Sequence, residues 1–298
     1  MPKPKVIAIV GPTASGKSSL GIFLAQKLGG EIISADSRQV YKSMEVITRA
    51  PTDKELASVP HHLVNFIDPK RTYSAGTFVR DAKKIIAEII ERGHVPIVVG
   101  GTGFYADALL RGLSLPEVQP NKKLRVELGK QTTDQLLSML KDLDAKSAER
   151  IDIHNRVRLI RAIEIAQALG SVPTLVEDPQ YETLWLGIHP DAKKHDTAIR
   201  HGVEDRLKQG MVDEAKKLRV ALSKKRFLSL GFEFSPLADF IDNNITSAEL
   251  EETLVHGELG YIKRQMRWFR RNTNIVWIKN KTDALQRAKM FCCTIGRH

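Results

Sequence analysis

The chain has 298 residues, of which 42% are hydrophobic and 27% are charged. This composition is typical of a globular protein with a substantial core, and it excludes collagen-like, disordered and disulfide-scaffold chains. Lys and Arg together number 46 against 35 for Asp and Glu, so the formal net charge is +11. Because basic side chains displace the counterions condensed on a phosphate backbone, this charge favours nucleic acid as a partner.

Two features predict the compartment. The two cysteines, Cys292 and Cys293, are adjacent and cannot close a useful disulfide loop, which indicates a reducing environment. The chain contains neither a signal-type segment nor 18 consecutive apolar residues. We therefore expect a cytoplasmic protein without a membrane partner.

The first hundred residues alternate between predicted strands and helices. Short apolar runs predict buried strands at 5–10, 31–36 and 95–101. Apolar side chains at helical spacing predict helices at 18–28 and 75–92. Buried strands that alternate with helices indicate a parallel sheet covered on both faces.

The pattern changes after Leu113. Residues 114–123 contain two prolines and are predicted to be a linker, and residues 124–169 show only helical spacing. A strand is predicted again at 183–190. The remaining predicted elements are helices near 196–220 and 247–271, a strand at 274–278 and a last helix at 282–291.

These elements predict two domains. Residues 115–180 form an all-helical insertion, and residues 1–114 and 181–298 form the catalytic core. The predicted fold class is α/β, a P-loop NTPase-like parallel sheet flanked by helices, because the first strand leads into a phosphate-binding motif.

That motif is GPTASGKS at residues 11–18, which matches the pattern G-x-x-x-x-G-K-[ST] between a buried strand and a helix start. Glycines let backbone amides turn toward an anion, and the helix N-terminus adds partial positive charge. Lys17 can reach terminal phosphate oxygens, and the Ser18 hydroxyl group can ligate Mg²⁺. The predicted phosphate-binding residues are Gly11, Pro12, Thr13, Ala14, Ser15, Gly16, Lys17 and Ser18.

The motif alone also fits a nucleotide kinase or NTPase. In those enzymes a strand often ends in an acid that helps to hold Mg²⁺, whereas the third strand here runs into Gly100, Gly101 and Thr102. The carboxylate is instead Asp36, at the end of the second predicted strand. Because the carboxyl ends of parallel strands line the ligand crevice, we expect Asp36 beside the phosphates, as a general base or near the metal.

Three motifs follow one another along the chain: GPTASGKS, ADSRQVY at 35–41 and VVGGTGFY at 98–105. Together they resemble the tRNA dimethylallyltransferase (tRNA isopentenyltransferase, IPP transferase) family. Further matching segments are PHHL at 60–63, RLIRAIEI at 158–165, GMVDEAKKL at 210–218 and KRQMRWFRR at 263–271. The resemblance therefore covers nearly the whole chain.

The resemblance implies transfer of a dimethylallyl group from dimethylallyl diphosphate to N6 of the adenosine 3′ to the anticodon in tRNA. It implies Asp36 as the general base, with Lys17 and Thr102 at the catalytic centre, and it implies that the loop holds the prenyl diphosphate. Mg²⁺, bound with the help of Ser18, is the implied cofactor. The implied tRNA contacts are Asp36, Ser37, Arg38, Gln39, Thr102, Arg125, Arg158 and Arg161. We expect a monomer that binds the anticodon stem-loop.

The chain departs from the family pattern at three places. Residues 231–234 read GFEF where relatives usually read GYKE, so an expected Lys or Arg is absent. Gly202 stands where an Arg is expected before Val203, and Asn155 stands at an Asp position. These departures affect expected diphosphate or tRNA contacts, but not the core chemistry.

Two weaker signals remain. The adjacent His61 and His62 could suggest a metal site, but they lack a partner at ligand spacing, so we predict a loop that packs near the substrate. Segment 259–271 combines an apolar stripe with basic side chains, and this pattern favours contact with an anion over a solvated helix face.

Two other functions stay open: a prenyltransferase that acts on free adenine nucleotides and a small-molecule P-loop kinase. The arginines of the insertion favour tRNA over a free nucleotide, which needs no added basic domain. The missing strand-end acid argues against a kinase. A protein that only binds its ligand is poorly supported, because it would need neither Asp36 as a base nor Ser18 as a metal ligand.

Overall fold

The computed structural model describes residues 2–189 and 192–293. The chain divides into two compact units. One runs up to Gly112 and resumes at Pro179, and the other is Leu113–Asp178. The boundaries of the second unit lie within two residues of the predicted insertion at 115–180.

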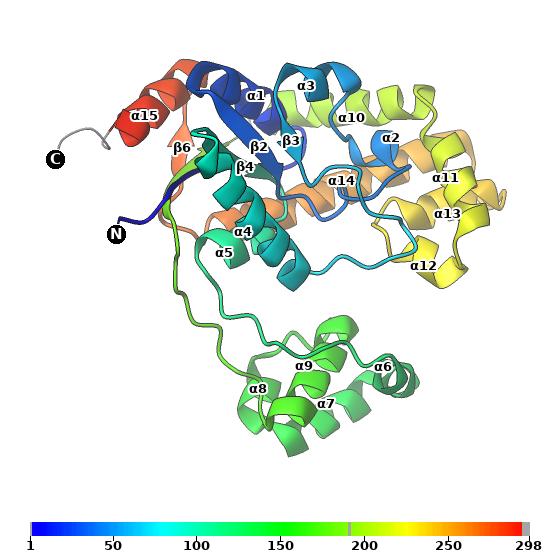
Figure 1. Cartoon of the computed structure of the whole chain (residues 1–298). Coiled ribbons are helices and arrows are strands. Elements are labelled where there is room, and N and C mark those ends of the chain that lie inside the picture. Colours follow the sequence, from blue (N-terminus) through cyan, green and yellow to red (C-terminus); the bar gives the residue numbers. More distant parts are fainter. Residues whose placement is uncertain (1, 190–191, 294–298) are drawn as a thin grey trace. The chain divides into compact units, whose positions relative to one another are not determined.

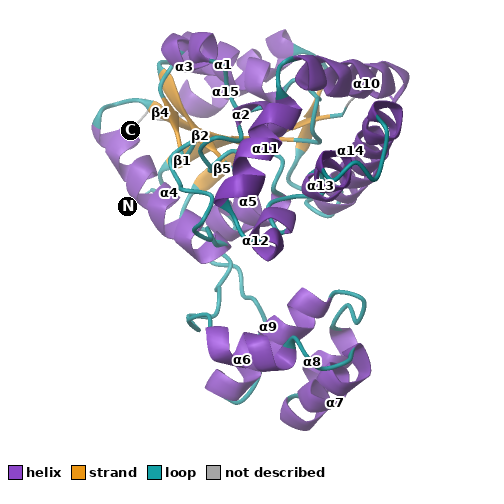
Figure 2. Cartoon of the chain, turned by 90° about the vertical axis from the view of Figure 1, so that its right-hand side faces the viewer, coloured by secondary structure: helices purple, strands orange, loops and turns teal. Residues whose placement is uncertain are grey.

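The first unit is built on a six-stranded parallel sheet (Figure 2). Its strands are β1 (Lys5–Val10), β2 (Gly30–Ser34), β3 (His61–His62), β4 (Val95–Gly100), β5 (Glu182–Ile188) and β6 (Val276–Ile278). The strand order is β3-β2-β4-β1-β5-β6, and all neighbours pair in parallel. The sheet therefore brings the carboxyl ends of β1, β2 and β4 to one edge, where parallel sheets bind ligands.

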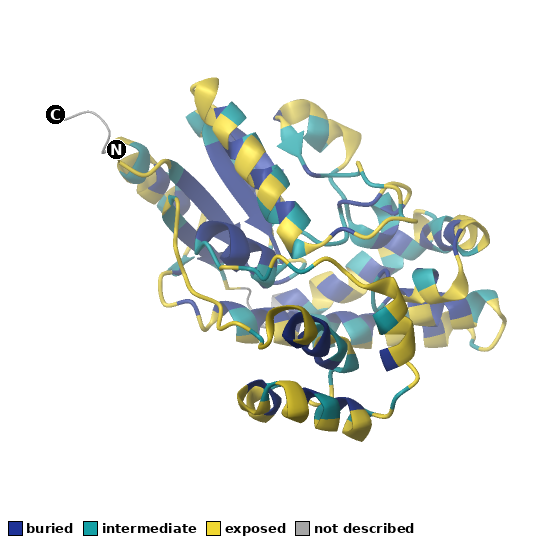
Figure 3. Cartoon of the chain, turned by 60° about the horizontal axis from the view of Figure 1, so that its bottom comes forward, coloured by how far each residue is buried: buried dark blue, intermediate teal, exposed yellow. Residues whose placement is uncertain are grey.

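Helices cover both faces of this sheet (Figure 1). They are α1 (Lys17–Leu28), α2 (Glu45–Thr48), α3 (Asp53–Ser58), α4 (Ala75–Glu91), α5 (Gly103–Leu110), α10 (Ala192–Lys208), α11 (Met211–Ala221), α12 (Lys224–Leu228), α13 (Phe234–Ile241), α14 (Ser247–Phe269) and α15 (Lys281–Cys293). Alternate residues of β1 point to opposite faces: Ile7 and Ile9 pack with α1 and α15, whereas Val6 and Ala8 pack with α4, α5 and α14. Both faces are thus buried, as the dark strands of Figure 3 show.

Several predicted boundaries were wrong. The strand predicted at 31–36 ends at Ser34, because the chain turns away from the sheet around the Asp36 carboxylate. The segment predicted as helical near 196–220 is divided at Gly210, where φ is 97°, into α10 and α11. Pro190, the last residue of the strand predicted at 183–190, lies outside the described residues.

The second unit holds four helices around an apolar core. They are α6 (Lys122–Leu128), α7 (Thr133–Leu143), α8 (Ala145–Arg150) and α9 (Arg156–Leu169). Leu136 and Leu140 of α7 pack against Leu159 and Ile163 of α9. Asn155 is the N-cap of α9, and its side chain accepts a hydrogen bond from a backbone amide at 3.1 Å. Asparagine caps helices as well as aspartate does, which accounts for this departure from the family pattern.

The two segments that enter and leave this unit are hydrogen-bonded to each other. Leu113 forms a bridge with Glu177, and the Ser114 amide donates to the Val176 carbonyl oxygen at 2.9 Å. Part of the predicted linker at 114–123 is therefore paired. None of the helices within the described residues is long and apolar enough to cross a membrane.

Candidate active site

The predicted phosphate-binding loop connects β1 to α1. Gly16 adopts φ 89° at the N-cap of α1, a left-handed conformation that favours glycine. Gly11 permits a close approach, because a Cβ atom there would lie 2.9 Å from the Ile188 carbonyl oxygen. Residues Thr13 to Ser19 line a cavity of about 320 Å³. The N-terminus of α1 therefore opens on this cavity, an arrangement that binds phosphate groups.

Two polar groups of the loop are available to an anion. The Ser15 hydroxyl oxygen is buried and has no hydrogen-bond partner in the described part of the chain. The Lys17 ammonium group donates to the Pro12 carbonyl oxygen at 2.5 Å. Burial lowers the pKa of Lys17 to about 8. The negative charge of Asp36 opposes this shift, and the positive charge of Arg49 adds to it. An incoming anion would stabilise the charged form of this side chain.

The ends of β2 and β4 place a carboxylate beside this loop. Asp36 lines the same cavity, and its Oδ1 accepts hydrogen bonds from the amides of Arg38 and Gln39 at 2.9 and 3.3 Å. Thr102 follows β4, and its hydroxyl group accepts a hydrogen bond from the Ser37 amide at 3.0 Å. Among residues 2–189 and 192–293, Asp36 Oδ2 has no hydrogen-bond partner. This oxygen is therefore free to accept a proton.

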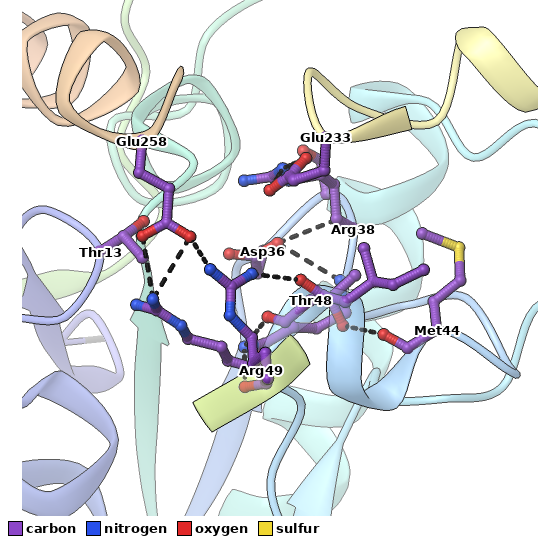
Figure 4. Close-up of polar contacts among 12 residues, drawn as sticks. Thr13, Asp36, Arg38, Met44, Thr48, Arg49, Glu233 and Glu258 are labelled. Atoms are coloured by element: carbon purple, nitrogen blue, oxygen red, sulfur yellow. Dashed lines mark hydrogen bonds and ion pairs between the residues drawn. The ribbon is translucent and has the colours of Figure 1, made fainter. Parts of the chain in front are cut away.

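Arg38 is held by the segment that departs from the family pattern. It forms an ion pair with Glu233, the residue that stands at the expected Lys or Arg position (Figure 4). Its guanidinium carbon lies 5.1 Å from the centre of the Phe232 ring and 4.8 Å from that of the Tyr261 ring. The carboxylate and the two rings together fix Arg38 in one place.

Beside Asp36, two guanidinium groups share one carboxylate. Glu258 of α14 forms ion pairs with Arg49, at 2.9 Å, and with Arg206. The side chains of Arg206 and Glu258 are only 6% and 4% exposed. Arg206 also donates to the carbonyl oxygens of Gly202 and Ile47, each at 3.0 Å. Burial lowers the pKa of Arg206. None of these three charged residues was predicted from the sequence.

Gln265, also on α14, joins the loop to β4. Its Oε1 accepts hydrogen bonds from the Thr13 amide and hydroxyl group, at 2.9 and 3.2 Å. Its Nε2 donates to the Gly101 carbonyl oxygen at 2.9 Å. The Thr13 carbonyl oxygen in turn contacts Nε2 of His195, on α10, at 2.7 Å. Gln265 lies within the KRQMRWFRR segment, and a polar residue on the apolar face of a predicted helix is the signal that could have revealed it.

A second cavity of about 460 Å³ adjoins the first. The two cavities share Arg38, Phe232 and Tyr261 in their linings. Burial, and then the charge of Asp36, raise the pKa of Tyr261. The rest of the second lining includes Ser37 and basic side chains, so aromatic and cationic groups surround this space. Such groups favour nucleobases and their phosphates.

The basic helix predicted at 259–271 is part of α14. Ile262, Met266 and Phe269 of its apolar stripe are buried in the core. Arg264 lines the second cavity, and its guanidinium carbon lies 5.7 Å from the centre of the Tyr261 ring. Contact between this helix and an anion remains a prediction.

The predicted tRNA contacts of the insertion belong to the second unit. Arg125 and Arg161 form ion pairs with Glu164, whose side chain is 2% exposed. Arg161 also donates to the Val118 carbonyl oxygen at 2.9 Å. Arg158 differs, since its side chain is 60% exposed. The glutamate three residues after Arg161 was the sequence signal that at least one of these arginines has a partner inside the unit.

The predicted loop at His61 and His62 is instead the edge strand β3, paired with β2. His62 Nε2 lies 2.6 Å from the Glu31 carboxylate, which also binds Arg92 and His94. Hydrogen bonds from Arg92 chiefly lower the pKa of Glu31, to about 2. Within the described residues, no group of three or more His, Cys, Asp or Glu side chains could hold a metal ion.

The parallel sheet, the GPTASGKS loop and the cavity at the carboxyl ends of its strands define a P-loop α/β protein, as the predicted fold class requires. The model of the IPP transferase family matches residues 39–272. The chain belongs to the IPP transferase family, and it is a transferase. The resemblance noted from the sequence motifs is therefore confirmed.

Relatives match almost the whole chain. The tRNA dimethylallyltransferase of Pediococcus pentosaceus is 37% identical over 96% of this chain and 94% of its own length. That of Synechococcus sp. (strain JA-3-3Ab) is 34% identical over 95% of this chain and 84% of its own.

Solved structures agree with the fold. The full-length tRNA isopentenylpyrophosphate transferase of Bacillus halodurans gives a TM-score of 0.73 at 33% identity, over 98% of this chain and 96% of that one. A eukaryotic dimethylallyltransferase acting on tRNA gives 0.76 at 26% identity, over 96% and 77% of the two chains.

Proposed function

We propose that this protein transfers a dimethylallyl group from dimethylallyl diphosphate to N6 of the adenosine 3′-adjacent to the anticodon in tRNA. The observation that carries the proposal is the position of Asp36 between two cavities. Asp36 lines the cavity of the phosphate loop, and the next two residues, Ser37 and Arg38, line the aromatic and basic cavity. A carboxylate at this junction can serve a diphosphate on one side and an adenine on the other.

In this proposal the two substrates enter from different sides. The loop residues Gly11 to Ser18 hold the diphosphate, with Lys17 as the principal charge. Ser37, Arg38, Gln39 and Thr102 contact the adenosine, which leaves the anticodon stack to reach the site. Extruding a loop nucleotide costs only a few kcal/mol, because no Watson–Crick pair is broken. One chain supplies all of these residues, so we propose that a monomer acts, in the cytoplasm.

The proposed reaction is a single displacement. The lone pair on N6 forms a bond to the allylic C1 atom, and the bond from C1 to the bridging oxygen breaks. The electron pair of that bond leaves on the diphosphate. The N6 proton passes to Asp36, whose Oδ2 is free to accept it. Lys17 and the loop amides stabilise the charge that develops on the diphosphate.

The loop fits a Mg²⁺ ion held partly by the substrate. Magnesium prefers oxygen ligands and commonly binds through few protein groups together with phosphates. Ser18 and Asp36 line the same cavity, and the hydroxyl oxygen of Ser15, another lining residue, is buried without a partner in the described part of the chain. We propose Ser18 as the protein ligand. When bound, the ion would neutralise charge on the leaving diphosphate.

The deciding experiment offers three acceptors side by side. The protein is incubated with radiolabelled dimethylallyl diphosphate and undermodified tRNA, AMP or ADP. We expect label in tRNA alone. Label in AMP or ADP but not in tRNA would favour a prenyltransferase for free nucleotides. ATP should be neither hydrolysed nor required, and turnover that depends on ATP would favour a kinase.

Diphosphate affinity should depend on pH through Lys17. The pKa of Lys17 is lowered to about 8, so the side chain is charged below this pH and neutral above it. Binding of inorganic diphosphate, followed by calorimetry, should therefore weaken as the pH rises above 8, approaching about tenfold per pH unit. Lys17→Arg should abolish this dependence, because a guanidinium group stays protonated. If both proteins gave the same profile, Lys17 would not be the titrating group.

The insertion should contribute to tRNA binding through Arg158. Its only ion pair in the described residues is with Asp152, at 3.9 Å, and such exposed pairs contribute about 1 kcal/mol or less to stability. Arg158→Ala should leave the melting temperature unchanged and reduce the log–log salt slope of tRNA binding by about 0.7 to 0.9. Affinity for dimethylallyl diphosphate should not change.

Arg125 and Arg161 are proposed as tRNA contacts as well, but they also stabilise the insertion. Arg161→Ala removes bonds to a buried carboxylate and a carbonyl oxygen, so it should cost about 1.5–3 kcal/mol of stability. This variant is the matched comparison for Arg158→Ala. Equal melting losses and unchanged salt slopes in both would contradict the proposed role of the insertion.

A further inference from the structure

The first cavity is lined by a positively charged side chain, Arg49, that has no role in the mechanism described above. Eight charged side chains line it: Lys17, Arg38, Arg49, Arg206, Asp36, Glu55, Glu233 and Glu258. Four are basic and four are acidic. Without Arg49 the lining would carry a net negative charge, which would oppose the binding of a diphosphate.

Arg49 and Arg206 share Glu258 but differ in what they can still bind. Arg206 uses all three guanidinium nitrogens, for Gly202, Ile47 and Glu258, and it is buried. Arg49 uses only Nη2, for Glu258. In the described chain its Nε and Nη1 atoms have no partner, and its side chain is 24% exposed. Arg49 is thus held at one nitrogen and available at two.

Two locally unfavourable features keep the guanidinium group of Arg49 in this place. Arg49 ends α2 in the left-handed conformation, with φ 54°, which non-glycine residues adopt at a cost. Gly202 lies inside α10, where glycine weakens a helix. A Cβ atom at Gly202 would lie 2.7 Å from Arg49 Nη2, so any other residue at this position would make the guanidinium group of Arg49 shift. Strained residues of this kind concentrate at functional sites.

The position of Arg49 is also fixed from other directions. Its carbonyl oxygen accepts a hydrogen bond from Gln39 Nε2 at 2.9 Å, which links it to the loop after β2. Figure 4 shows its side chain pointing toward Glu258. Its positive charge repels that of Lys17 and so helps to lower the pKa of Lys17. The guanidinium group is therefore close enough to interact electrostatically with the phosphate-binding loop.

We propose that Arg49 is a diphosphate-binding residue of this site, placed there through the space that Gly202 leaves open. Its two free nitrogens form the fork that suits adjacent phosphate oxygens. The proposal rests on the proposed function only in naming the prenyl diphosphate as the source of the diphosphate. It accounts for the missing Arg at position 202, because the charge comes from α2 instead of α10.

The test asks whether a change at Arg49 weakens the binding of diphosphate without weakening the binding of tRNA. In Arg49→Gln, the Kd of inorganic diphosphate and the KM of dimethylallyl diphosphate should both rise by about 10- to 100-fold, as expected for one charge-assisted contact. The KM of tRNA should stay within about twofold. Arg200→Gln is the matched control, because it removes one positive charge from α10 at a side chain that does not line the cavity. It should change neither constant.

A relocation experiment tests the role of Gly202. Gly202→Ala alone should lower diphosphate affinity, because the new Cβ atom displaces the Arg49 guanidinium group and the alanine supplies no charge of its own. Arg49→Ala combined with Gly202→Arg should recover most of the lost affinity, since the charge then comes from α10. A residue that serves only the structure would not be rescued by a charge on another helix.

The outcomes distinguish this inference from the proposed function. A folded Arg49→Gln variant with an unchanged diphosphate Kd, or with equal losses for diphosphate and tRNA, would overturn the role of Arg49. If Arg49→Gln fails to fold, Arg49→Lys decides, because it keeps the charge but loses the fork. Unchanged affinity in Arg49→Lys would also overturn the inference. Failure of the wild-type protein to label tRNA would refute the proposed function alone.

Discussion

Asp36→Asn should retain both substrates and lose the chemical step. Asparagine keeps an oxygen in the Oδ1 position, so the hydrogen bonds from the Arg38 and Gln39 amides, and with them the loop after β2, can persist. It cannot accept the N6 proton. Loss of a general base typically costs about 10²–10⁴ in rate, and single-turnover transfer to tRNA should fall by that factor.

Binding measurements complete this prediction. Dissociation constants for tRNA and for dimethylallyl diphosphate should stay within a few-fold of the wild-type values. Asp36→Ala is the useful comparison, since it removes the acceptor of both amide bonds and should disturb binding as well. A near-normal single-turnover rate in Asp36→Asn would remove Asp36 from its role as the base.

Glu258→Ala should destabilise the first unit more than other single changes on α14. It leaves the Arg206 guanidinium group, which is 6% exposed, without its carboxylate. Breaking a buried ion pair from one side typically costs about 3–5 kcal/mol. For a unit of this size the melting temperature should fall by on the order of 10 °C. Thermal unfolding followed by circular dichroism measures the change.

The same helix provides the control. Glu252 lies on α14 six residues before Glu258, it is 71% exposed, and it pairs with Arg200 at 3.1 Å. Glu252→Ala should cost no more than about 1 kcal/mol, because water screens exposed pairs. Similar melting temperatures for the two variants would mean that the cluster around Glu258 contributes little to stability.

The sequence predicted the sheet where the periodicity was strong. β4 and all but the first residue of β1 are apolar runs, β2 is centred on Ile32 and Ile33, and the loop after β1 carries a motif with a fixed structural setting. Shorter elements were missed, since β3 has two polar residues and pairs only through its backbone. The division at Gly210 also escaped notice, because apolar spacing continues on both sides of it.

The candidate site was predictable only where one segment carries it. Asp36 and the loop follow strands directly, so their place at the sheet edge follows from topology. Arg49, Arg206 and Glu258 come from the end of α2, from α10 and from α14, and their partnership depends on packing that no local pattern encodes. The tRNA contact of Arg161 stays a prediction, and the structure adds that Arg161 also pairs with the buried Glu164.

The paired entry and exit segments of the insertion make it a separable module. Because Leu113 and Glu177 are already bridged, the ends left by removing the unit between them lie close together. A short turn could join them with little loss of chain entropy. The P-loop core would then remain continuous while the arginines of the insertion are gone. Under the proposed function, in which the insertion contributes to tRNA binding, a change from tRNA to a smaller acceptor would then need no new active site.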